Sequence, residues 1–176
     1  MFSTLLGFGF GLVAASLYRK HYPANQARRV LFRRYGILAL FGLAHMFLLF
    51  YGDIMLTYGL VGILLAAMLT LSSKTLRIIA YSILVVFTAM GVMGAYASMY
   101  FDATKGFPEA EPTAALDTPA AYLSANLDMA VGMLGMQPIA AVQLLALAII
   151  GYVWARERVL IDVASHRRTL ITWTVI

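Results

Sequence analysis

The sequence predicts an all-α fold, a polytopic bundle of transmembrane helices, from three observations. Hydrophobic residues make up 62% of the 176 residues, and the mean hydropathy is +0.83. Only 12% of the residues are charged, whereas a soluble domain carries about a quarter, so polar side chains could not cover a water-facing surface. The apolar residues also fall into runs of about 20, the length of a helix that crosses a bilayer.

Five full runs and a shorter sixth predict one membrane-embedded helical domain over residues 1–176. The first run has no basic residues before it and positive charges after it, which is the reverse of a signal peptide. The last run stops after about two helical turns. The predicted spans are 1–18, 35–52, 54–71, 77–100 and 134–154, with a partial sixth span at 169–176.

The basic residues predict the orientation of these spans. Six lie in 19–34, two in 72–77 and four in 155–168, so twelve of the thirteen fall in connections on one side. The positive-inside rule makes that side cytoplasmic and puts the N-terminus outside. The acidic, proline-rich connection 101–126 is then extracytoplasmic, and we expect its end, from Pro119, to form an interfacial helix.

Composition also excludes several classes of site. The chain has no cysteine, which excludes disulfides, zinc–thiolate sites and thiol catalysis, and we expect no metal site. Its net charge of +5 is explained by cytoplasmic connections, so we expect no nucleic-acid partner.

Two ionisable residues interrupt the apolar stretch GLAHMFLLFYGDIMLTYGL (42–60). His45 lies about 15 Å into the second span, where an ionisable group costs several kcal/mol unless it is paired or hydrated. It either hydrogen-bonds a neighbouring helix or acts as a general base or proton relay, and we expect a hydroxyl, carbonyl or carboxylate within reach. Asp53 follows Gly52 in a very tight turn and is expected to cap the third span. Along a continuous helix the two lie about 12 Å apart, so no direct contact is expected.

Helical periodicity predicts a polar path through the second span. Residues 34, 38, 41, 45, 49 and 52 share one face. We interpret this face as an interior path from Arg34 at the cytoplasmic foot, past His45, to Asp53 at the outer mouth. Small residues should let neighbouring helices approach closely; these are Gly36, Gly42 and the glycines of GFGFG (7–11).

The basic run ARRVLFRRYG (27–36) has two interpretations. It is either a topology signal that also contacts anionic lipids, or a phosphate site. In the second case Arg29, Arg33 and Arg34 have the spacing that would let guanidinium pairs clamp a coenzyme or lipid headgroup.

Three segments together resemble a known family. They are FSTLLGFGFGL, RRYGILALFGLAHMFLLFYGDIMLTYGLVGILL and LLALAIIGYVWARERVL, and the hairpin around His45, Gly52 and Asp53 is the most specific part. In this order they resemble the YeiB family of multi-pass bacterial inner-membrane proteins, whose function is unassigned. The resemblance covers essentially the whole chain. It implies that the chain is a fragment, without a helix ahead of residue 1 and without the rest of the sixth.

That family is distantly similar to transmembrane acyltransferases, including heparan-α-glucosaminide N-acetyltransferase. The resemblance therefore implies transfer of acyl groups from cytoplasmic acyl-CoA to an acceptor across the membrane. His45 would transfer the acyl group or a proton, with Asp53 in the same catalytic site. The CoA phosphates would bind Arg29, Arg33 and Arg34.

Two other functions stay open from the sequence. A solute or proton permease would use Arg34, His45 and Asp53 to line its path and would need no site for a CoA-sized anion. A structural subunit, in a homo-oligomer or a larger membrane complex, would close the polar face of the second span with a partner chain. All three place the protein in the lipid bilayer.

The predicted topology can be tested by cysteine labelling, because the chain has no native cysteine. Arg28→Cys should react with an impermeant maleimide only from the cytoplasmic side, and Glu109→Cys only from the outside. Reaction of both from the same side would contradict the topology.

Overall fold

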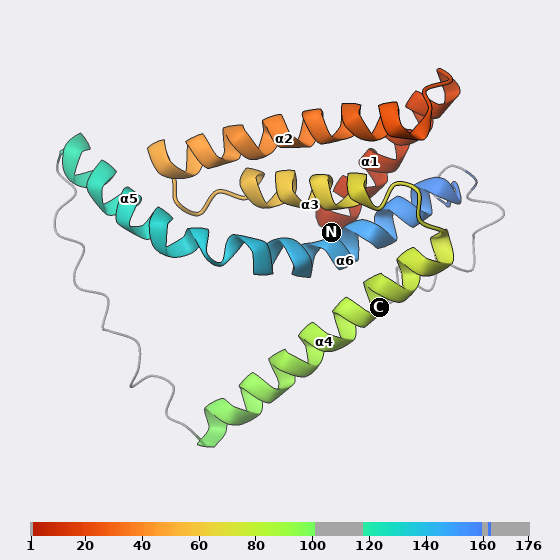
Figure 1. The fold of residues 1–176 in the computed structure, drawn as a ribbon. Helices are drawn as coiled ribbons and strands as arrows, with labels where there is room; N and C mark the ends of the chain where they lie inside the picture. The colour runs from red at the N-terminus through yellow and green to blue at the C-terminus, as the bar shows by residue number, and fades with distance from the viewer. Residues whose placement is uncertain (1, 101–117, 160–161, 163–176) are drawn as a thin grey trace.

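The structure, a computed structural model, describes residues 2–100, 118–159 and 162, and within them it contains helices and no strands (Figure 1). This confirms the all-α class for the described residues. The helices are α1 (Phe2–Arg19), α2 (Ala24–Leu48), α3 (Met55–Ala67), α4 (Ser73–Tyr100), α5 (Pro119–Leu134) and α6 (Gln137–Arg156).

Four of these helices, α1, α2, α4 and α6, are long and apolar enough to cross a membrane. Helix α3 is apolar but has only 13 residues, which is about 20 Å of helix against a hydrocarbon core of about 30 Å. The described residues are therefore consistent with a membrane protein, with four helices of spanning length rather than the predicted five. The predicted partial span 169–176 lies outside the described residues.

The helix that contains most of the second predicted span has different bounds. The span was predicted over 35–52, whereas α2 begins at Ala24 and ends at Leu48. Its first turns are rich in alanine, glutamine and arginine, which form helices well but are invisible to a hydropathy pattern. At 25 residues α2 is about 37 Å long, so the helix extends beyond its apolar part. The turn to α3 is also longer than predicted, since residues 49–54 connect the helices.

The last predicted span, 134–154, corresponds to α6 with a break in front of it. Helix α6 begins at Gln137 and carries Pro138 in its first turn, where the missing N–H costs nothing. The helix expected from Pro119 is present as α5, and the Thr118 hydroxyl caps it by accepting from Ala121 N at 3.2 Å. Residues 101–117 of the predicted loop lie outside the described residues.

Helix α6 occupies the centre of the bundle, and Figure 1 shows α1 and α3 alongside it while α4 leans away. The aromatic ring of Phe10 from α1 lies 5.5 Å from that of Tyr35 in α2 and 5.1 Å from that of Tyr152 in α6, measured between centroids. In contrast, the described side chains of α4 that are buried are Leu76 and Ala80, both near its start. The core therefore joins α1, α2, α3 and α6, and of α4 the first half packs against it.

Glycines set the closest helix contacts. A Cβ on Gly7 would overlap the backbone carbonyl of Ala148 in α6, and one on Gly42 would overlap Leu56 N in α3. Close approach was predicted for these positions and is confirmed there. It is wrong for Gly9 and Gly36, where a Cβ would meet nothing within 4 Å.

The Gly7 contact predicts a matched pair of variants. Gly7→Ala should separate α1 from α6 and cost about 1–3 kcal/mol, as overpacking does. Gly9→Ala adds the same methyl group in open space and should be neutral or slightly stabilising, because alanine favours helix. Thermal unfolding in detergent measures both. Equal melting temperatures would contradict the packing described here.

Candidate functional site

Most of the buried polar side chains lie close to the connection between α2 and α3. The described residues bury four polar side chains, and three of them lie around this connection. They come from three different helices or connections, so the site is a tertiary arrangement rather than a sequence motif. The three are Asp53, Thr57 and Asn126.

His45 and Asp53 are in direct contact, with 3.2 Å between Nδ1 of the imidazole and Oδ1 of the carboxylate. The prediction that they would not touch is wrong. It assumed a continuous helix, but α2 ends at Leu48 and the chain reverses over residues 49–54. The reversal brings Asp53 back alongside the last turn of α2.

Asp53 serves two groups at once. Its Oδ2 accepts a hydrogen bond from Leu56 N at 3.2 Å, so the predicted capping of α3 is confirmed. Its Oδ1 faces His45. The carboxylate is nearly buried, and the helix N-terminus and the imidazole are both favourable neighbours for a negative charge.

One edge of the His45 imidazole, at Nδ1, is buried against Asp53, and the rest of the ring is partly exposed. Nδ1 is buried, and Asp53 Oδ1 is the polar atom within reach, although the alignment falls short of a well-formed hydrogen bond. The side chain is 34% exposed, and this exposure belongs to its other atoms. His45 also lines an apolar cavity of about 550 Å³, together with Leu38, Phe41 and Met55.

Asn126 of α5 holds the reversal in place. Its Nδ2 donates to Met46 O at 3.0 Å and to Phe47 O at 2.9 Å, and its Oδ1 accepts from Tyr51 N at 2.7 Å. One helical turn earlier, the Tyr122 hydroxyl donates to Leu49 O at 2.6 Å. Sequence reasoning missed this role because it placed Asn126 in a polar connection. The i, i+4 spacing of Tyr122 and Asn126 was the available signal.

Helix α6 is tied to the same region through its first residue. The Thr57 hydroxyl hydrogen-bonds Gln137 Oε1, and Gln137 Nε2 lies 3.7 Å from the sulfur of Met46. The His45–Asp53 pair therefore rests on contacts from α3, α5 and α6.

The predicted interior path from Arg34 is not inside the described bundle. Arg34, Phe41 and Leu49 of the predicted face are exposed. Helix α2 packs through its other face, where Tyr35, Gly42 and Met46 are buried. Of the predicted face, Leu38 packs partly against the core and His45 contacts Asp53.

The arginines expected to bind phosphate lie away from His45. Arg29, Arg33 and Arg34 are exposed in the first half of α2, and Arg34 is about 16 Å along the helix from His45. No carboxylate of the described residues forms an ion pair with them.

Comparison with protein-family models, curated proteins and solved structures finds no match to this chain. What the geometry of the described residues defines is a class: an all-helical protein with helices of membrane-spanning length and a histidine–aspartate pair where the chain reverses between two helices. The resemblance to the YeiB family stays a prediction.

Asn126→Ala should destabilise the protein, because it leaves Met46 O, Phe47 O and Tyr51 N without partners. Each unsatisfied buried group costs about 1–3 kcal/mol. Asn25→Ala, at an exposed position of α2, is the matched control and should change little. Thermal unfolding and protease cleavage within 49–54 measure the effect; an unchanged melting temperature for Asn126→Ala would rule out this anchoring role.

Proposed function

We propose that this protein is a membrane acyltransferase in which His45 is the general base and Asp53 orients it. The observation that carries the proposal is the 3.2 Å contact between His45 Nδ1 and Asp53 Oδ1. A carboxylate at Nδ1 favours the tautomer with its proton on that nitrogen, which leaves Nε2 free to accept one. Neutral imidazole is suited to proton transfer near pH 7.

In the proposed reaction, His45 Nε2 takes the proton of an acceptor hydroxyl or amine as the acceptor attacks the thioester carbonyl of the donor. The new bond to the acyl carbon forms, the carbon–sulfur bond breaks, and the thiolate takes the proton back from the imidazolium. Asp53 stabilises the imidazolium between these steps. The apolar walls beside His45, formed by Phe41, Leu48 and Met55 among others, suit an acyl chain.

The proposed donor is acyl-CoA from the cytoplasm. Arg29, Arg33 and Arg34 support this role because guanidinium groups bind phosphates bidentately, and no described carboxylate neutralises these three. Membership of the YeiB family and a place in the bacterial inner membrane belong to the same proposal. The permease alternative has less support, since its path from Arg34 runs along an exposed face of α2.

The test is release of thiol from acetyl-CoA by the protein in nanodiscs, with membrane extract as the source of acceptor. The chain has no cysteine and adds no thiol background. His45→Ala should reduce the rate by about 10²–10⁴, the usual contribution of general acid–base catalysis. Asp53→Asn should keep the fold, because asparagine also caps helices, and show an intermediate rate.

His21→Asn, at an exposed histidine between α1 and α2, is the control and should keep full activity. Melting temperatures of all variants separate loss of chemistry from loss of fold. Thiol release that is unaffected by His45→Ala would refute the proposed role of His45. A proton or solute flux in liposomes without any thiol release would contradict the proposed transferase function and support the permease function instead.

A further inference from the structure

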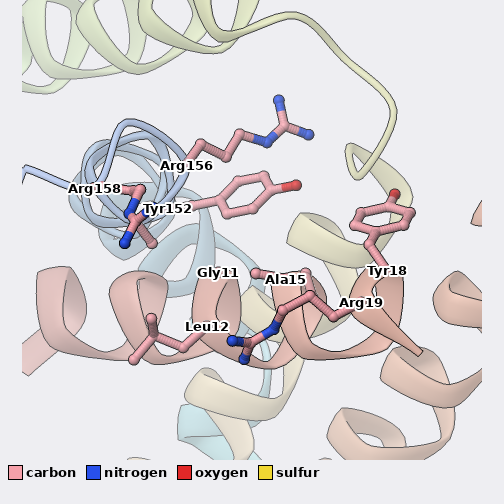
Figure 2. Close-up of a pocket in the computed structure, with 10 residues that line it drawn as sticks. Gly11, Leu12, Ala15, Tyr18, Arg19, Tyr152, Arg156 and Arg158 are labelled. Atoms are coloured by element: carbon pink, nitrogen blue, oxygen red, sulfur yellow. The ribbon is translucent and has the colours of Figure 1, made fainter. Parts of the chain in front are cut away.

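A second cavity, of about 780 Å³, lies between the ends of α1 and α6 (Figure 2). It lies at the end of the bundle where α1 and α6 finish and α4 begins. Small residues such as Gly11 and Ala15 form one wall, and the ring of Tyr152 lies above them. Three arginines line the cavity, and its described lining contains no carboxylate; they are Arg19, Arg156 and Arg158.

Arg156 is already engaged by the fold. Its guanidinium donates to the carbonyl oxygens of Leu69 and Leu71 and lies 4.4 Å from the centroid of the Tyr152 ring. It therefore fixes the connection between α3 and α4 and positions Tyr152.

Within the described residues, the guanidinium groups of Arg19 and Arg158 have no such partner. Neither forms an ion pair there, and the nearby Glu157 is paired with Arg77 instead. The C-termini of α1 and α6 contribute roughly −0.5 elementary charge each. Three guanidinium charges exceed this, so the described lining of the cavity carries a net positive charge.

The backbone at Arg158 is the second observation. Arg158 has φ 57°, in the left-handed region. Its N–H donates to Ala155 O at 3.3 Å and Val159 N donates to Trp154 O at 3.0 Å, which is a Schellman motif closing α6. Glycine is the favoured residue at this position, because a Cβ is strained there. The left-handed backbone at this position therefore gives no preference for arginine, and glycine would fit it better.

We propose that this cavity binds the phosphate ester of an amphiphile, with Arg19 and Arg158 as the phosphate ligands. A guanidinium fork matches phosphate oxygens geometrically, and Leu12, on the same wall as Arg19, gives an apolar surface for the rest of the molecule. The phosphate comes either from an anionic phospholipid headgroup or from a soluble organic phosphate. The site is separate from Arg29, Arg33 and Arg34, and it does not depend on acyl transfer.

The experiment uses the full chain in nanodiscs of phosphatidylcholine with and without phosphatidylglycerol. Native mass spectrometry counts retained phosphatidylglycerol, and calorimetric titration of the phosphatidylcholine discs with glycerol 3-phosphate tests the soluble source. Arg19→Gln and Arg158→Gly should each weaken phosphatidylglycerol retention by about tenfold, the effect of one lost charge-assisted hydrogen bond. Arg158→Gly should not lower the melting temperature in phosphatidylcholine, because glycine relieves the left-handed strain.

Two controls match these variants. His21→Gly relieves the same strain at the end of α1, where His21 has φ 59°, without removing a cavity arginine, and should retain the lipid. Lys74→Gln removes an exposed positive charge at the same end and should change retention less than twofold.

Equal losses of phosphatidylglycerol for Lys74→Gln and the two arginine variants would overturn the proposal in favour of diffuse surface charge. Binding of glycerol 3-phosphate that both arginine variants weaken would support the site with a soluble ligand, and no binding in either arm would overturn it.

Discussion

The fold depends on one constraint: the backbone polar groups at the reversal between α2 and α3 need hydrogen-bond partners. Hydrocarbon cannot hydrogen-bond the carbonyls at the end of a helix, so an irregular segment near membrane depth needs partners from the protein. Asn126 and Tyr122 of α5 supply them to four backbone groups at the end of α2 and in the segment that follows. With that segment fixed, Asp53 can cap α3 and meet His45 at the same time.

The remaining helices are organised by a different rule, close approach through small residues. Helix α1 lies directly against α6 because Gly7 and Gly151 leave room for the partner's backbone. This contact places Phe10 between Tyr35 and Tyr152 and so joins the hairpin of α2 and α3 to the centre of the bundle. The same pairing of α1 and α6 aligns their last turns and forms the walls of the arginine-lined cavity.

Hydropathy predicted the helical class and the approximate position of α1, α4 and α6. It could do so because a helix suited to a lipid environment is a long run of apolar residues. It could not predict the start of α2 at Ala24, where helix propensity continues without hydrophobicity. The His45–Asp53 contact was also out of reach, since separation along the chain says nothing about a reversal that depends on α5. Likewise, position 158 holds an arginine and not the glycine that usually indicates a left-handed residue. Its left-handed backbone could therefore not be predicted from the sequence.

The short length of α3 determines the route by which small molecules would reach His45. A 13-residue helix cannot separate the two faces of a bilayer. If the connection from α3 to α4 lies at one interface, the reversal at residues 49–54 lies about 10 Å short of the other. Molecules dissolved in the lipid phase would then meet His45 laterally, from among the acyl chains. Their effective concentration there would be set by partition into the bilayer rather than by their concentration in water.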